Sequence, residues 1–222
     1  MTKRVGMVTI GQSPRIDVVP EIKKILGHKV EIVECGALDG LSEEKVKELA
    51  PAGDDLILVT RMRSGKEVTV AESRILPRLQ DCVDHLAKDC EILALLCTGR
   101  FPELTSRRVL LTPDALLDGI VNGIHGVKTM GVLIPSREQL GQMSNRWKQN
   151  GRKIVVEYAS PYSSQDTVSP SARKLASSDP DLIVLDCMGY TMRTKETVAK
   201  ITGKPVILPR SVLAHSILEL IG

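Results

Sequence analysis

Two cysteines, Cys97 and Cys187, are the residues of this sequence best suited to acid–base chemistry at a carbon atom. Cys97 directly follows a short apolar run of the kind that forms a buried strand, and Cys187 follows such a run after Asp186. Each cysteine is followed two residues later by a glycine, Gly99 or Gly189. If two thiols flank one carbon, one thiolate removes a proton and the opposing thiol delivers a proton to the other face. Each sulfur must come within about 3–3.5 Å of the carbon, so the pair is expected roughly 6–7 Å apart, too far for a disulfide bond.

A cysteine at the end of a buried strand is also a common small apolar filler of a protein core. We assign this filler role to Cys35, Cys82 and Cys90. For Cys97 and Cys187, the matched positions and the glycine that follows each of them favour a catalytic role.

The elements that must position these cysteines follow a repeated plan. Short β-branched runs alternate with amphipathic segments, which is typical of parallel sheets with helices on both faces. Each half of the chain has a strand, a capped helix, a later strand that ends in Cys-x-Gly, and a short strand followed by a helix. Strands are expected at 5–10, 92–96 and 109–111 in the first half, and at 129–134, 182–186 and 206–208 in the second. The shared order predicts a duplicated α/β unit.

The first half contains additional elements. A helix is expected to begin at Ser13 and Pro14, because serine is a preferred N-cap and proline a preferred first helical residue. In chain order, a second strand is expected at 30–34 and a third at 56–60. The third strand is followed by a β-hairpin-like excursion over 61–71.

An anion site is expected in the loop 11–15, where the first strand leads into this helix. Ligands of open α/β sheets bind beyond the carboxyl ends of the strands, and free N–H groups at a helix start attract anions. The Ser13 hydroxyl and the Arg15 guanidinium would strengthen the site, although an ordinary helix cap with a surface arginine fits equally well. Arg61 and Arg63 follow the third strand on the same side, as a clamp for a second carboxylate or phosphate or as solvated hairpin residues.

Composition and missing motifs narrow the classes of partner and cofactor. The net charge is only +3 and no dense Lys/Arg run occurs, so nucleic acid is not an expected partner. No apolar run approaches the roughly 20 residues of a membrane span and no signal peptide is recognisable, so we expect a cytoplasmic protein without a membrane partner. Five cysteines in such a protein are expected as free thiols. Without a complete phosphate-binding loop, a G-x-G-x-x-G turn or a C-x-x-C pair, neither a dinucleotide cofactor nor a metal is expected.

Over its whole length the sequence resembles the AroM family, through motifs at 8–15 (VTIGQSPR), 96–99 (LCTG) and 185–190 (LDCMGY). AroM proteins are similar to the superfamily of aspartate, glutamate and hydantoin racemases, which also includes arylmalonate decarboxylase and maleate isomerase. The resemblance implies two α/β domains related by a pseudo-two-fold axis, a cleft between them, chemistry by one or two cysteines without a cofactor, and often a homodimer. It places the family cysteines on Cys97 and Cys187, the substrate loop on 11–14, and the last helix on the first domain. The expected domains are 1–112 with 206–222, and 113–205.

The sequence also departs from the amino-acid racemases of that superfamily. Thr98 follows the first cysteine directly where those enzymes have Asn and then Thr, and Met188 stands where they have Thr. The loop 11–15 replaces their acidic or glycine-rich start. The residues that hold a free amino-acid head group are therefore not matched here.

These observations predict a cofactor-independent racemase or isomerase of a small carboxylate, with Cys97 and Cys187 as the opposing acid/base pair. The alternatives are a decarboxylase that uses one cysteine as proton donor, a non-catalytic protein that binds an anionic metabolite, and an inert member of the fold. The expected partner is a small carboxylate or other anion. The residues expected to bind it are Gly11, Gln12, Ser13, Pro14, Arg15, Arg61, Thr98, Gly99, Met188, Gly189 and Tyr190.

Overall fold

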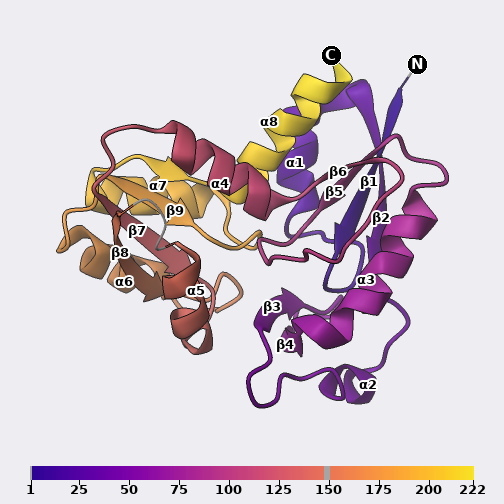
Figure 1. Cartoon of the computed structure of the whole chain (residues 1–222), viewed down its shortest axis with the longest axis horizontal. Helices are drawn as coiled ribbons and strands as arrows, with labels where there is room; N and C mark the ends of the chain where they lie inside the picture. The colour runs from indigo at the N-terminus through magenta and orange to yellow at the C-terminus, as the bar shows by residue number, and fades with distance from the viewer. Residues whose placement is uncertain (1, 148–150) are drawn as a thin grey trace. The chain divides into compact units, whose positions relative to one another are not determined.

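The structure, a computed structural model, describes residues 2–147 and 151–222 and divides the chain into two compact units (Figure 1). Unit 1 comprises Met1–Leu116 and Arg210–Gly222, and unit 2 comprises Leu117–Pro209. The division falls within helix α4 (Pro113–Gly123). None of the described helices has the length and apolar character that a membrane span requires.

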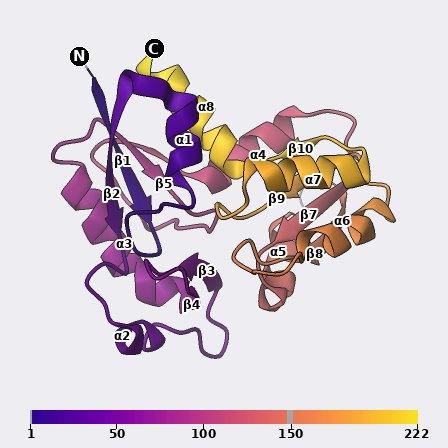
Figure 2. The ribbon, with the colours of Figure 1, turned by 180° about the vertical axis from the view of Figure 1, so that it is seen from behind.

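Unit 1 is built on a four-stranded parallel sheet in the order β2-β1-β5-β6. The strands are β1 (Lys3–Thr9), β2 (Val30–Gly36), β5 (Ile92–Leu95) and β6 (Val109–Leu111). The helical segments are α1 (Val19–Leu26), the 3₁₀ turn η1 (Gly27–Lys29), α2 (Glu43–Lys47), α3 (Glu72–Leu86) and α8 (Pro209–Ile221). Figures 1 and 2 show α3 on one side of this sheet and α1 with α8 on the other. All four residues of β5 are buried, as expected for a parallel strand that is covered on both faces.

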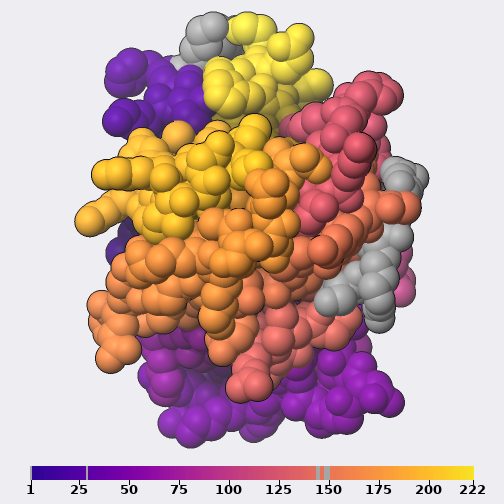
Figure 3. All heavy atoms as spheres, turned by 90° about the vertical axis from the view of Figure 1, so that its left-hand side faces the viewer, coloured from indigo at the N-terminus to yellow at the C-terminus, as the bar shows by residue number. Residues whose placement is uncertain are grey.

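Unit 2 repeats this topology, with a parallel sheet in the order β10-β9-β7-β8. The strands are β7 (Thr129–Ile134), β8 (Lys153–Tyr158), β9 (Leu182–Leu185) and β10 (Val206–Ile207). The helical segments are the 3₁₀ turn η2 (Arg137–Gln139), α5 (Leu140–Arg146), α6 (Val168–Ala176) and α7 (Met192–Thr202). The atoms of α6 and α7 lie side by side in Figure 3, covering one face of the unit. Corresponding strands take the same places in both sheets, which confirms the predicted duplicated α/β architecture.

One pair of glycines shows how the two central strands are packed alike. Gly6 in β1 faces Leu93 of β5, and an added Cβ would lie 2.6 Å from a methyl carbon of that leucine. Gly131 in β7 faces Ile183 of β9, where the corresponding distance is 3.2 Å. A side chain at either glycine would crowd the large apolar side chain on the neighbouring strand.

The helix expected to begin at Ser13 and Pro14 begins instead at Val19. Ser13 lies outside this helix, whose N-cap position is occupied by Val18, and the Ser13 hydroxyl donates a hydrogen bond to Asp39 instead. The Ser13–Pro14 peptide bond is cis. The proline that starts α1 is Pro20, which stands in its first turn.

The third strand expected at 56–60 exists as β3 (Ile57–Arg61), but it is not part of the parallel sheet. It pairs only with β4 (Glu67–Ala71), antiparallel, in a separate two-stranded sheet. Gly65, with a φ of 94°, provides the left-handed residue of the connecting turn. The excursion expected over 61–71 is therefore the turn and second strand of a hairpin that β3 begins.

The prediction that all five cysteines are free thiols is wrong for Cys35 and Cys82. Cys35, at the end of β2, is joined by a disulfide bond to Cys82 on α3, which packs against β2. Their Cα atoms lie 5.5 Å apart, a typical disulfide separation. Cys90 is a buried free thiol, as expected of a core filler, and its burial raises the pKa of that thiol.

Candidate functional site

The turn that carries Cys97 leaves the carboxyl end of β5. Leu96 extends the strand pairing by donating its N–H to the carbonyl of Val8, 2.7 Å away. The chain then turns, and the Gly99 N–H donates a hydrogen bond to the Cys97 sulfur at 3.2 Å. Gly99 has no room for a side chain, because an added Cβ would lie 2.8 Å from the Leu58 Cδ2 atom of β3. Thr98 and Cys97 are both buried.

The turn that carries Cys187 leaves the carboxyl end of β9 in the same way. Asp186 donates its N–H to the carbonyl of Leu133 at 2.8 Å, as Leu96 does in unit 1. The Gly189 N–H donates to the Cys187 sulfur at 3.4 Å. An added Cβ on Gly189 would lie 2.7 Å from the Pro161 Cγ atom and from the Tyr162 hydroxyl, so a larger residue here would have to displace both side chains.

The two turns therefore give their cysteines one local environment. Each sulfur sits in the apolar core of its own unit and accepts the N–H of the glycine two residues on. A donated N–H stabilises negative charge on sulfur, which is the form that acts as a base or nucleophile. In unit 2 the turn leads directly into α7, whose N-cap Thr191 forms a reciprocal capping box with Thr194.

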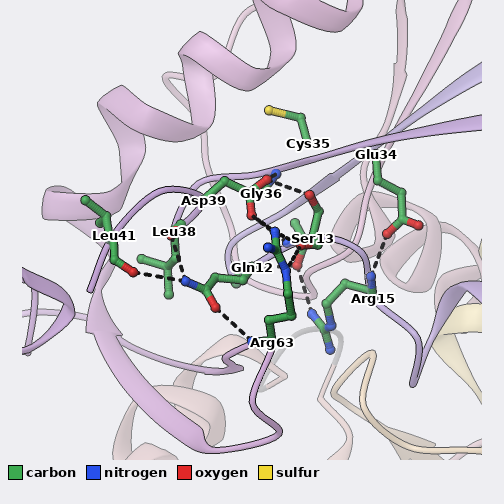
Figure 4. A network of polar contacts seen from close by, with 12 residues as sticks. Gln12, Ser13, Arg15, Glu34, Cys35, Gly36, Leu38, Asp39, Leu41 and Arg63 are labelled. Carbon is green, nitrogen blue, oxygen red and sulfur yellow. Dashed lines mark hydrogen bonds and ion pairs between the residues drawn. The ribbon is translucent and has the colours of Figure 1, made fainter. Parts of the chain in front are cut away.

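The loop 11–15 follows β1, and the structure gives each of its N–H donors a partner inside unit 1. Figure 4 shows the partners of Ser13 and Arg15. The four bonds run from Gly11 to the Thr9 hydroxyl, from Gln12 to the Arg61 carbonyl, from Ser13 to Asp39 and from Arg15 to Glu34. Residue 14 is proline and has no N–H. The expected anion site needs N–H groups at a helix start that have no partner within the protein. Because α1 begins at Val19, the loop is not a helix start, and in this conformation its N–H groups are all bonded within unit 1.

Ser13 is held on every polar atom by residues distant in the sequence (Figure 4). The Asp39 carboxylate accepts its N–H at 2.8 Å and its hydroxyl at 2.5 Å, and also accepts the Gly36 N–H at 2.8 Å. The Arg63 guanidinium donates to its carbonyl. Because the hydroxyl proton is given to Asp39, Ser13 presents its remaining lone pairs and acts toward a ligand as an acceptor.

Arg15 is buried and bound within the unit rather than directed at a ligand. Its guanidinium donates two hydrogen bonds to Asp17, at 2.9 and 2.8 Å, and a third to Thr9. Burial acts to raise the pKa of Asp17, but the hydrogen bonds and charge of Arg15 outweigh it and hold that pKa below its ordinary value. Burial raises the pKa of Glu34, against the opposing effect of the Arg15 N–H.

Arg61 lies at the end of β3, beside the same loop. Its Nε donates to the Gly65 carbonyl at 3.0 Å, and its Nη1 lies 3.9 Å from Asp17. With 27% of its side chain exposed, Arg61 is better placed than Arg15 to meet an anion. The hairpin thus supports both parts of the site in unit 1, since Gly11 packs against Thr60 and Gly99 packs against Leu58.

The remaining predicted residues are in unit 2. Met188 and Tyr190 are buried beside Gly189, and the Tyr190 hydroxyl donates to the carbonyl of Ala159 at 2.8 Å. The structure therefore brings together the predicted residues of each unit around its own cysteine or its own loop. Among the described residues, no group of three or more His, Cys, Asp or Glu side chains is arranged to hold a metal ion.

Sequence reasoning missed the side chains that support these turns. Asp39 was not singled out, although it follows the carboxyl end of β2, where residues of a site are expected. In unit 2, Asp186 is fully buried and forms an ion pair with Arg146 at 3.3 Å and accepts the Trp147 indole N–H at 2.8 Å. The sequence contained a signal for this cluster, because Asp186 is a charged residue at the end of an apolar run, directly before Cys187.

Comparison with known proteins assigns the chain to a family. The family described as AroM protein matches residues 5–221. The chain belongs to the AroM family. No curated protein matches this AroM chain. The resemblance read from its three motifs is confirmed.

Solved structures show which fold this AroM protein shares. Picrophilus torridus aspartate racemase is 12% identical, with a TM-score of 0.60 over 99% of this chain and 94% of that one. A serine-for-cysteine mutant of Nocardia farcinica maleate cis-trans isomerase, with a covalently bound succinylcysteine intermediate, is 15% identical, with a TM-score of 0.63 over 98% and 91%. Unliganded arylmalonate decarboxylase is 13% identical, with a TM-score of 0.59 over 100% and 93%. The AroM chain therefore has the aspartate/glutamate racemase-like α/β fold over nearly its whole length.

Proposed function

We propose that this AroM protein is a cofactor-independent racemase or isomerase of a small carboxylate, with Cys97 and Cys187 as an opposing acid/base pair. One observation carries the proposal: both units end the corresponding strand in a cysteine whose sulfur accepts the N–H of a glycine two residues on. Duplicated turns of this kind supply one proton-transfer group from each unit. The shared fold with a racemase, an isomerase and a decarboxylase supports the same class of chemistry.

In the proposed reaction, the thiolate of one cysteine takes the proton from the carbon next to the carboxylate. The electron pair of that C–H bond moves into the carboxylate, which becomes an enediolate. The thiol of the other cysteine then gives its proton to the opposite face of the carbon, so the two cysteines exchange protonation states. The glycine N–H groups favour the thiolate that each step requires.

The proposed carboxylate ligands are Arg61 and the Thr98 hydroxyl, both in unit 1. The Gly189–Tyr190 backbone expected from the sequence gives its N–H groups to Cys187 in this conformation. We assign carboxylate binding to Arg61 rather than to the N–H groups of the loop 11–15, because those N–H groups are bonded within unit 1. Ser13 would accept a hydrogen bond from the substrate, because its proton is given to Asp39. The substrate is therefore expected to carry a hydroxyl, amide or ammonium donor as well as its carboxylate.

A decarboxylase is the second candidate, favoured by a difference between the two turns. Cys187 is followed by the capped start of α7 after four residues, whereas the next described helix after Cys97 begins at Pro113. A helix start stabilises a nearby thiolate, so the two thiols are not equivalent. A single cysteine that protonates the carbanion left by loss of carbon dioxide would use that difference.

Deuterium exchange in heavy water distinguishes these functions. Chiral small carboxylates and substituted malonates are offered to wild type, Cys97→Ser, Cys187→Ser and the control Cys90→Ser, and the α-proton signal is followed by NMR. The proposal predicts exchange that falls by about 10²–10⁴-fold in each of the first two variants and is unchanged in the control. Carbon dioxide release that survives the loss of one cysteine would identify the decarboxylase. Absence of turnover with every compound would overturn both enzymes and favour a binding protein.

A further inference from the structure

We propose that Cys35 and Cys82 form a thiol–disulfide modification site, oxidised by small disulfide molecules such as glutathione disulfide and reopened by thiols. We further infer that this bond controls how firmly the Ser13–Asp39 contact is held. The proposal rests on unit 1 alone and does not depend on the proposed reaction.

Both cysteines can be reached from one pocket. A pocket of about 240 Å³ is lined by Cys35 and Cys82 together with Gly36, Arg78 and Asp81. Cys35 is only half-buried, whereas Cys82 is 5% exposed and lies within the core of unit 1. A small thiol or disulfide entering this pocket therefore meets Cys35 first, and Cys82 is placed as the second, resolving thiol.

The pocket lining includes one cation, Arg78, and two carboxylates, Asp39 and Asp81. Arg78 stands one helical turn before Cys82 on α3, so both side chains lie on the same face of that helix. Its guanidinium is fixed there by hydrogen bonds to the carbonyls of Ala37 and Asp39. Of these three charges, the Arg78 guanidinium is the one that favours a thiolate, which is the form that attacks a disulfide.

The oxidation balances as two exchange steps. The Cys35 thiolate attacks one sulfur of the small disulfide, forming a mixed disulfide and releasing one thiolate. The Cys82 thiolate then attacks the Cys35 sulfur, forming the Cys35–Cys82 bond and releasing the second thiolate. The protein pair loses two electrons and two protons, and the small disulfide is reduced to two thiols. Excess thiol reverses both steps.

The bond is connected to the site loop through two residues. Cys35 is paired in register with Val8 of β1, and the next residue, Gly36, donates its N–H to Asp39. The same carboxylate holds the N–H and hydroxyl of Ser13, as Figure 4 shows with Cys35 beside Gly36. A Cβ added to Gly36 would lie 2.6 Å from the Ser13 nitrogen, so the two loops are in direct contact. Opening the disulfide releases the end of β2 from α3 and loosens this contact.

The first test measures the chemistry. Wild-type protein is equilibrated in glutathione buffers of increasing oxidation, quenched with acid, denatured and alkylated, and its cysteine peptides are quantified by mass spectrometry. We expect Cys35 and Cys82 to convert together and reversibly between a linked pair and two alkylated thiols, while Cys90 is alkylated throughout. A pair that never forms the bond in glutathione disulfide, or never opens in excess glutathione, would overturn the proposal.

The second test measures the coupling, first in wild-type protein. Hydrogen–deuterium exchange is compared between oxidised and reduced wild type in peptides covering 9–16 and 35–41, with β7 of unit 2 as the internal reference. Reduction is expected to speed exchange in both unit 1 peptides by roughly tenfold and to leave β7 unchanged. Equal exchange in the two redox states would overturn the coupling to Ser13. The Cys35→Ser/Cys82→Ser variant should show the reduced pattern under both conditions.

Discussion

Asp39 is the acceptor on which the Ser13 loop depends, so replacing it is expected to destabilise unit 1. Asp39→Ala removes the partner of two backbone N–H groups, on Ser13 and Gly36, and of the Ser13 hydroxyl. It also removes a 3.6 Å ion pair with Arg63, whose side chain is 64% exposed. All four contacts join segments that are separated in the sequence or stabilise the turn after β2.

The contacts allow the size of the effect to be worked out. A hydrogen bond to a charged group contributes about 1.5–3 kcal/mol, but the Asp39 side chain is 31% exposed and water can replace part of that loss. The exposed Arg63 pair adds at most about 1 kcal/mol. We therefore expect Asp39→Ala to lower the free energy of unfolding by about 2–4 kcal/mol. Asp39→Asn, which keeps one acceptor oxygen, should lower it by about half as much.

Urea unfolding under fixed redox conditions checks this expectation. Circular dichroism reports on both units, whereas fluorescence of Trp147, the single tryptophan of the chain, reports on unit 2. The expected loss should therefore appear in the circular dichroism transition and not in the fluorescence transition. Asp54→Ala, at an exposed position, is the matched control and should change stability by less than about 0.5 kcal/mol. An Asp39→Ala protein as stable as this control would refute the reasoning.

Three further predictions concern other parts of the site. Gly99→Ala is expected to destabilise unit 1 by about 1–3 kcal/mol, because its Cβ would meet a leucine methyl carbon of β3 at 2.8 Å. Gly119→Ala, in open space on α4, should be neutral or stabilising in parallel thermal melts, and an equal loss in both would contradict the packing argument. Asp186→Asn is expected to lower the free energy of unfolding by about 3 kcal/mol and to shift the Trp147 emission, because both the indole and a buried arginine lose the carboxylate that they share. An unchanged emission maximum would count against that cluster. The raised pKa of Glu34 means that the folded state binds its proton more tightly than the unfolded state, so wild-type stability should fall as pH rises from 4.5 through the folded pKa. Glu34→Gln should lose that decline and be the more stable protein at neutral pH, and identical pH profiles would refute this assignment.

The duplicated sheet and the two cysteine turns were predictable from the sequence because their signals are local. Buried strands such as β5 and β9 read as short apolar runs, and the Cys-x-Gly pattern at the end of each run marks its carboxyl end. The segment after Cys187 also reads locally as a helix, expected from about residue 194, and α7 begins at Met192 with Thr191 as its N-cap.

The Ser13 loop, the disulfide bond and the pairing of β3 could not be predicted in this way, because they depend on contacts between segments that are distant in the sequence. Ser13 looks like a helix cap until Asp39, 26 residues away, takes its hydroxyl. The Cys35–Cys82 bond spans 47 residues and forms only because α3 crosses β2. Likewise, β3 has the composition of a sheet strand, and only its turn to β4 decides that it pairs in a hairpin.

The central claim is that Cys97 and Cys187 act on one carbon from opposite sides, and a cross-linking experiment tests it without knowledge of the substrate. Native protein is treated with a bis-electrophile that bridges about 6–7 Å between two sulfur atoms, then digested and mapped by mass spectrometry. The account predicts a single adduct that joins Cys97 to Cys187 and is absent from Cys97→Ser and Cys187→Ser. It also predicts the same adduct in Cys90→Ser. Separate adducts on Cys97 and Cys187, with the second arm of the reagent unreacted or hydrolysed, would contradict the two-cysteine mechanism.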